Sequence, residues 1–258
     1  MDSLSIYAAR ASGLHHLNPI TKLVLTLCLM LCGLILPGMW TSYLILLSIL
    51  VPLAIWGQVL RRLSQLVFSV SLPLIVSVFI IQTLFWGKGT PLFEIGPFAP
   101  KLEGLLFSIT SAGRILFIMG DFILFSLATR PDMLMISLKQ AGLPGGLAYI
   151  IVTTLQLVPR FVTKANTILD AQRSRGLETQ GNILVRAKAL LPLVLPLVIG
   201  SLVEVEERAI AIEARAFNSK HTETSLIEIP DSQAQKLARI GLVFGAVLVI
   251  VSRFIWLS

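Results

Sequence analysis

Two short arginine-centred segments are the parts of this chain best suited to specific chemistry. They are Ser174-Arg175-Gly176 and Ala214-Arg215-Ala216, and each places an arginine between two small residues. Small neighbours leave the guanidinium free to enter a groove on another protein, where its five donors suit carboxylate and carbonyl oxygens. We call them the Arg175 signature and the Arg215 signature, and we interpret them as a pair of docking points.

Each signature lies near the end of a long helical pattern, so a simpler explanation also has to be weighed. An exposed arginine at a helix C-terminus stabilises its own helix by a few tenths of a kcal/mol, without any partner. Two such segments forty positions apart in one polar region favour docking. The solvated-charge alternative stays open, because spacing alone does not remove it.

Arg114 and Asp121 are a second candidate, because they are ionisable residues within an apolar segment. They are seven positions apart and therefore share a helical face. An ionisable residue at membrane depth is costly, and it usually faces the bundle interior or a polar cavity. A proton or ion path is the functional interpretation. For a single pair we prefer the structural one, an intramembrane polar contact.

Other candidate sites are weak. Cys28 and Cys32 lie four apart in an apolar helix, where two sulfurs favour packing over metal binding. In the turn 204–207 only Glu204 and Glu207 share a helical face, so we interpret it as solvated charge. The motifs of metalloproteases, serine hydrolases and nucleotide-binding loops are absent. We therefore expect no catalytic residues and no metal site.

Composition indicates a membrane protein. The 258 residues are 55% hydrophobic and 14% charged, with a mean hydropathy of +0.84, whereas soluble domains carry about 25% charged residues. The net charge is +7, but the basic residues do not form one stripe with aromatic residues, so nucleic acid is not an expected partner.

Four apolar segments precede the two signatures and one follows them. Each approaches the ~20 residues with which a helix crosses a bilayer. A transmembrane domain is expected over 1–129 and a last transmembrane helix within 236–258. The predicted spans are about 20–36, 40–56, 66–86, 105–127 and 237–256.

The central region, 130–235, predicts three helices, at about 131–141, 147–173 and 182–217. Within the third, residues 189–203 form an apolar run of about 22 Å, short of the ~30 Å hydrocarbon thickness. We prefer a helix against the inner face of the membrane domain, and a true span is the alternative.

The basic residues predict the orientation. Seventeen of them fall on the side of the N-terminus and the central region, whereas only Lys88 and Lys101 fall in the opposite loop. Because basic residues collect on the cytoplasmic side, the N-terminus and the central region are expected in the cytoplasm. The sequence thus predicts an all-α polytopic membrane protein with about five transmembrane helices. A cytoplasmic helical coupling domain is inserted between the fourth and fifth.

Several motifs resemble one family. They are Leu17-Asn18-Pro19-Ile20-Thr21-Lys22-Leu23, Arg114, Thr129-Arg130-Pro131, Gly142-Leu143-Pro144, Leu157-Val158-Pro159-Arg160-Phe161 and the two signatures. Together they are similar to the transmembrane T component of energy-coupling factor (ECF) transporters, over nearly the whole chain. This chain has Ser174 where the family motif has Ala, and Ala216 where it has Gly.

The resemblance implies a non-catalytic subunit of a prokaryotic importer for a vitamin or a transition metal. Its partners would be two ATPase subunits, identical or different, a small membrane S component that binds the substrate, and membrane lipid. Arg175 would dock in one ATPase and Arg215 in the other. ATP and magnesium would be used by the ATPases, with no cofactor bound directly. The expected location is the prokaryotic cell membrane, with several passes.

Two other functions are compatible with the composition. A conventional ABC permease subunit would line its own substrate path, but such subunits usually present one short coupling loop, whereas this chain has two signatures in one insertion. A membrane-embedded enzyme would use Arg114, Asp121 or the turn at Glu204, and it would be active without ATPase partners.

Overall fold

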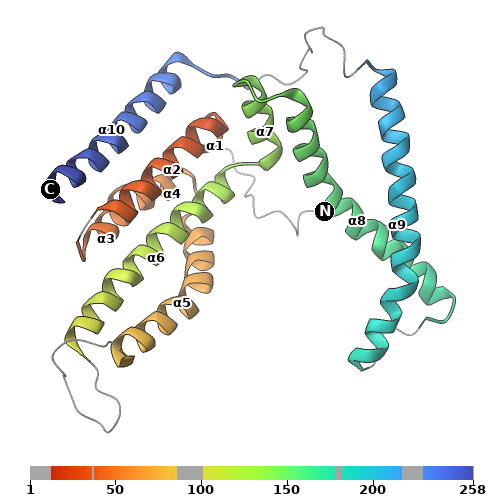
Figure 1. Cartoon of the computed structure of the whole chain (residues 1–258), viewed down its shortest axis with the longest axis horizontal. Helices are drawn as coiled ribbons and strands as arrows, with labels where there is room; N and C mark the ends of the chain where they lie inside the picture. Colours follow the sequence, from red (N-terminus) through yellow and green to blue (C-terminus); the bar gives the residue numbers. More distant parts are fainter. Residues whose placement is uncertain (1–12, 37, 86–100, 178–181, 217–228, 258) are drawn as a thin grey trace. The chain divides into compact units, whose positions relative to one another are not determined.

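All elements in the described part of the chain are helices. The structure is a computed structural model that describes residues 13–36, 38–85, 101–177, 182–216 and 229–257. They form two compact units (Figure 1). Unit 1 comprises Met1–Leu143 and Ile229–Ser258, and unit 2 comprises Pro144–Glu228.

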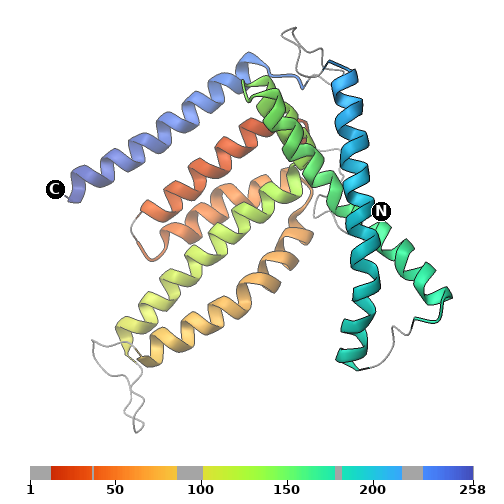
Figure 2. The same cartoon turned by 45° about the vertical axis from the view of Figure 1, so that its right-hand side comes forward.

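Unit 1 is a bundle whose central helix is α6 (Leu102–Ala128). It lies between α2 (Pro19–Ile35) and α5 (Leu60–Phe85) in both views (Figure 1, Figure 2), and it packs on both. Phe117 and Leu127 of α6 are fully buried in this core. The remaining helices of the unit are α1 (Gly13–His16), α3 (Thr41–Ile45), the π-helical turn η2 (Leu46–Leu50), α4 (Val51–Trp56), α7 (Pro131–Gln140) and α10 (Gln233–Leu257).

The start of α2 follows from its sequence. Asn18 Oδ1 accepts a hydrogen bond from Ile20 N at 2.9 Å, and Pro19 occupies the first turn. This satisfies one of the N–H groups that a helix start leaves without a partner, and proline has none to satisfy. The cap and the first-turn proline thus set where α2 begins.

Polar contacts hold together the helix ends that flank the central region. Lys22 Nζ donates to Ala128 O at 2.8 Å, and this carbonyl ends α6, where no later turn supplies a donor. Gln235 Oε1 at the start of α10 accepts from Asn18 N at 3.0 Å and from Thr21 Oγ1 at 3.4 Å. The ends of α2, α6 and α10 are thus fixed to one another within unit 1.

Within the described ranges, four helices are long and apolar enough to cross a membrane, judged by length and composition. They are Leu60–Leu84, Leu102–Ala128, Gly145–Ser174 and Gln233–Arg253, while Pro19–Ile35 and Thr41–Trp56 are shorter apolar helices. The all-α polytopic fold class is confirmed. Three details differ from the sequence analysis. The first two predicted spans, 20–36 and 40–56, correspond to the shorter apolar helices, the third begins at Leu60 instead of 66, and Gly145–Ser174 also meets the criterion. The predicted outer loop, 87–104, lies mostly outside the described residues.

The helix α7 packs against α2 and belongs to unit 1. From the sequence it was expected in the central region, together with the two longer helices. Unit 2 therefore contains α8 (Gly145–Ser174) and α9 (Ile183–Ala214), close to the predicted ranges 147–173 and 182–217. Both run without a break through their prolines, Pro159 in α8 and Pro192 and Pro196 in α9.

Candidate functional site

The candidate site is the crossed helix pair of unit 2 with its two C-terminal ends. Figure 2 shows α8 and α9 crossing as an X, and the two helices are in contact. The C-terminal end of α8 and that of α9 lie at opposite ends of the pair in both views (Figure 1, Figure 2). These are the ends that carry the Arg175 and Arg215 signatures.

At the crossing one carboxylate faces several cations. Glu204 of α9 lies 3.6 Å from Lys164 Nζ and 3.8 Å from Arg160 Nη1, both on α8, and it also pairs with Arg208 one turn further along α9. Gly200, one turn before Glu204, makes room for Lys164, because a Cβ at position 200 would lie 2.9 Å from Lys164 Nζ. The crossing is therefore an electrostatic contact across a close helix approach.

The apolar side chains of this pair point away from the crossing. On α8 an apolar face repeats every three or four residues and is exposed, while Arg160 and Lys164 lie on the opposite face towards α9. The exposed apolar residues of α8 are Leu147, Ile150, Ile151, Leu155, Val158 and Val162. Those of α9 are Val194, Leu195, Val198, Ile199, Leu202, Val203, Val205 and Ile210. The pair is polar inside and apolar outside, a pattern that suits apolar surroundings and not water.

In both signatures the residue after the arginine has a left-handed backbone. At the end of α8, Leu177 N donates to Gln172 O at 3.0 Å and Gly176 N to Arg173 O at 2.9 Å, which is a Schellman motif with Arg175 as the C-cap. Gly176 has φ +89°. Such a left-handed residue reverses the chain direction directly after the arginine.

Ala216 occupies the corresponding position after α9. It has φ +55°, and its N–H donates to Glu213 O at 2.9 Å, the same pattern as Gly176 to Arg173. An alanine can take this conformation, although its Cβ makes it less favourable than for glycine. Ala216 therefore keeps the left-handed backbone and the N–H bond that glycine has at the end of α8.

The six signature residues are accessible. Ser174, Arg175, Gly176, Ala214, Arg215 and Ala216 are all exposed. Arg175 follows Lys164 by eleven residues and Arg215 follows Glu204 by eleven, so each arginine lies about 17 Å along its helix from the crossing. Eleven residues are close to three full turns, which places each arginine near the helical face that holds its crossing residue.

The ion pairs at the crossing were not predicted. The turn 204–207 was interpreted as solvated charge, and Glu206 and Glu207 are indeed exposed, whereas Glu204 is half-buried between cations. The sequence does contain a signal for these ion pairs, namely charged residues with the same spacing on both helices. Arg160 and Lys164 are four residues apart on α8, and Glu204 and Arg208 are four residues apart on α9. Such residues share a face of their helix.

Arg114 and Asp121 lie on α6 in unit 1, but no ion pair between them is present in the part of the chain described. Asp121 is only 2% exposed. Its Oδ2 atom and Arg114 Nε are both buried without a hydrogen-bond partner. A polar contact for these residues stays a prediction. The free cysteines, Cys28 and Cys32, lie on α2, and no metal-binding group of His, Cys, Asp and Glu occurs among the described residues.

Comparison with known proteins agrees with the helical organisation. The profile of the CbiQ family, described as cobalt transport protein, matches residues 10–226. The chain belongs to this family. It is a multi-pass membrane protein, and the resemblance to the transmembrane component of ECF transporters is confirmed.

Individual relatives match along nearly their full length. The chain is 28% identical to the energy-coupling factor transporter transmembrane protein EcfT of Thermosediminibacter oceani, over 97% of each chain. It is 29% identical to the EcfT protein of Leuconostoc gelidum, over 95% of this chain and 94% of the relative. With the EcfT protein of Bacillus subtilis it shares 28% identity, over 84% and 86% of the two chains.

Proposed function

We propose that this chain is the energy-coupling transmembrane subunit of an ECF-type importer and carries out no catalysis itself. Its relatives are named as transmembrane proteins of energy-coupling factor transporters. The observation that supports the role best is the pair of exposed arginines, each followed by a left-handed residue at the C-terminal end of one of two crossed helices. This arrangement presents two equivalent cations at separate points, as two partner subunits would require.

In this proposal each signature docks in one of two cytoplasmic ATPase subunits, identical or different. Arg175 enters a groove of the first and Arg215 a groove of the second. The small flanking residues keep the approach open, and the left-handed backbone at Gly176 and Ala216 follows directly after each arginine, at the end of its helix. The ATPases bind ATP and magnesium, so the chain needs no cofactor of its own.

The crossed helices act as two levers joined at the crossing. When ATP brings the ATPase subunits together, the docked ends of α8 and α9 approach each other. The Lys164–Glu204 pair holds the two helices together at the crossing, about 17 Å along each helix from its arginine. When the two docked ends move towards each other, the helices therefore turn about this contact and the angle between them changes. The motion reaches the exposed apolar faces, where it is passed to a membrane subunit.

That membrane subunit is a separate S component, which holds the cargo, a vitamin or a transition metal. The exposed apolar side chains of α8 and α9 offer it a surface of matching chemistry. The N-terminus and unit 2 lie on the cytoplasmic side of a prokaryotic cell membrane in this proposal. The distribution of basic residues supports this orientation.

The docking role is tested by charge reversal. Arg175→Glu and Arg215→Glu are introduced singly and together into the full chain, co-expressed with candidate ATPases and S component. Loss of an arginine buried in a groove against a carboxylate typically costs about 2–5 kcal/mol, so each single change weakens ATPase co-purification and the double change abolishes it. Uptake of the cargo is lost in parallel.

Arg173→Glu is the matched control for charge reversal at this helix end. Arg173 lies two residues before Arg175, is half-exposed and pairs with Asp170 at 3.3 Å, an exposed pair worth less than about 1 kcal/mol. It should leave ATPase binding within about five-fold of the unchanged chain. Equal co-purification of the unchanged chain and the double variant, with equal membrane insertion, would contradict the docking role.

A further inference from the structure

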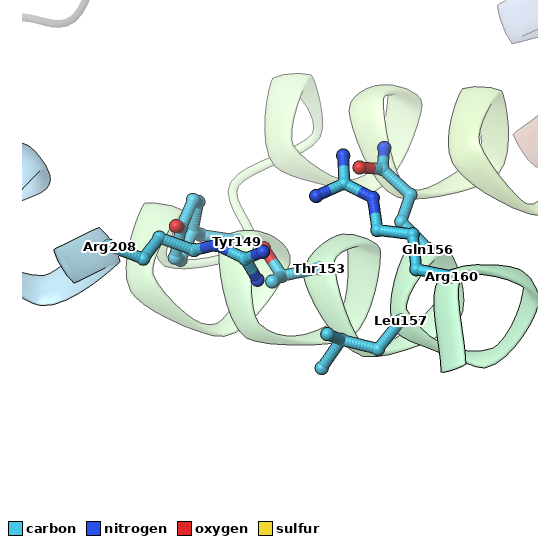
Figure 3. Close-up of a pocket in the computed structure, with 6 residues that line it drawn as sticks. All are labelled: Tyr149, Thr153, Gln156, Leu157, Arg160 and Arg208. Atoms are coloured by element: carbon cyan, nitrogen blue, oxygen red, sulfur yellow. The ribbon is translucent and has the colours of Figure 1, made fainter. Parts of the chain in front are cut away.

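A pocket lies between α8 and α9 beside the crossing (Figure 3). Its volume is about 140 Å³, several times what a single water needs. Five of the lining residues come from α8 and one from α9. They are Tyr149, Thr153, Gln156, Leu157, Arg160 and Arg208.

The charge around this pocket is unbalanced. Arg160, Lys164 and Arg208 all lie within ion-pair distance of a single carboxylate, Glu204. No second carboxylate pairs with any of these three cations in the described ranges, so the group carries a formal charge of +2. Cations crowded together repel one another, most strongly where water is scarce. The pocket therefore favours an anion.

The lining supplies hydrogen-bond donors for that anion. Figure 3 shows Arg208 reaching across from α9 to Tyr149 and Thr153, while the side chains of Gln156 and Arg160 project together from the next turns of α8. Two guanidinium groups, two hydroxyls and one amide suit an acceptor with several oxygens, such as a phosphate group. No acidic side chain lines the pocket.

The outer faces of the pair indicate where the phosphate comes from. Both helices expose apolar side chains on the sides turned away from the crossing, which suits contact with lipid or membrane protein. In such surroundings the abundant anion is the phosphate of an anionic phospholipid, and basic pockets between helices on the cytoplasmic side bind such head groups. We propose that this pocket binds the phosphate of an anionic phospholipid headgroup through Arg160 and Arg208. This site is separate from the ATPase docking points and does not depend on them.

The test is lipid binding to the purified full chain in mild detergent, followed by native mass spectrometry. Phosphatidylglycerol, phosphatidylcholine and inorganic phosphate are titrated separately. We expect phosphatidylglycerol to bind at least about 10-fold more tightly than the zwitterionic lipid, because only the former has net charge to offset. The double variant Arg160→Gln and Arg208→Gln should lose that preference, whereas Arg173→Gln, on α8 but outside the pocket, should keep it.

Glu204→Gln is a second variant whose effect has the opposite sign. It removes the carboxylate that competes with the ligand, so phosphatidylglycerol should bind several-fold more tightly, which a misfolded chain would not do. The proposal is overturned if the two lipids bind equally to the unchanged chain. It is also overturned if inorganic phosphate binds as tightly as the lipid, or if neither the double variant nor Glu204→Gln changes the affinity.

Discussion

At the scale of single residues, the position after each arginine decides how the helix ends. Gly176 and Ala216 both have a left-handed backbone, which glycine adopts freely and alanine adopts at a cost of roughly 1–2 kcal/mol. Among the residues that the structure describes, no atom outside the chain neighbours lies within 4 Å of a Cβ built at Gly176, so the cost of a methyl there is argued from the backbone. Both signatures thus have a left-handed residue after the arginine, and they differ in the free-energy cost of that backbone conformation, which is higher for Ala216 than for Gly176.

A reciprocal pair of substitutions tests this difference. Gly176→Ala should destabilise the last turn of α8 by about 0.5–1 kcal/mol, because the lower entropy of alanine in the unfolded chain offsets part of the roughly 1–2 kcal/mol backbone cost. Ala216→Gly should stabilise the last turn of α9 by a similar amount. Hydrogen exchange measured by mass spectrometry on these two turns should speed up in the first variant and slow down in the second, by roughly two- to five-fold. Faster exchange in Ala216→Gly would mean that this residue does not need the left-handed backbone.

At the scale of elements, glycines let the helices of unit 1 approach one another over aromatic rings. A Cβ at Gly33 of α2 would lie 2.2 Å from Phe117 Cε1 of α6, and one at Gly113 of α6 would lie 2.5 Å from Tyr43 Cε2 of α3. Tyr43 also donates its hydroxyl proton to Ile109 O at 2.8 Å. Small residues at such contacts are typical of helix packing in membranes, where close van der Waals contact drives association.

The contact between α2 and α6 is therefore predicted to be intolerant of a methyl group. Gly33→Ala should destabilise unit 1 by about 1–3 kcal/mol, because Phe117 is fully buried and has no free space to move into. The measurement is thermal unfolding of the purified chain in detergent.

Gly245→Ala on α10 is the matched control for that substitution. A Cβ at Gly245 meets nothing within 4 Å, and alanine favours a helix over glycine by up to about 1 kcal/mol. Its melting temperature should be unchanged or slightly raised. If Gly33→Ala melts together with this control, the helices are not in the close contact described.

At the scale of the whole molecule, unit 2 is inserted in the sequence between two segments of unit 1. The chain leaves unit 1 after α7 and re-enters it before α10, whose start is bonded to that of α2 through Gln235. Unit 2 is thus an insertion with both of its connections in unit 1. Such an insertion can be moved by partners without unfolding the bundle that carries it.

The orientation of the insertion is tested by cysteine labelling in whole cells. In a background with Cys28 and Cys32 replaced by alanine, Ser174→Cys should react with a membrane-impermeant maleimide only after the cells are permeabilised. Lys88→Cys, in the predicted outer loop, should react in intact cells, because the positive-inside distribution places it outside. Labelling of Ser174→Cys in intact cells would contradict the predicted orientation, and it would exclude docking of this segment to cytoplasmic ATPases.

Much of the fold could be predicted from the sequence because it depends on local properties. Runs of apolar residues predicted the membrane helices, and the helices predicted at about 147–173 and 182–217 lie close to α8 and α9. The start of α2 is encoded just as locally, by a capping asparagine followed by a first-turn proline. The starting residue of α5 was missed by six positions, because Arg61 and Arg62 are compatible both with a helix and with the loop before it.

The sequence by itself determined the helices, the predicted orientation and the two arginine signatures, since each is encoded by neighbouring residues. Only the tertiary structure decided which side chains meet across two helices. Glu204 pairs with Lys164 because α8 and α9 cross at that level, where Gly200 leaves room for the end of the Lys164 side chain, and a different crossing point would have paired other residues. The register of one helix on another depends on close packing along their whole contact, which local periodicity does not contain.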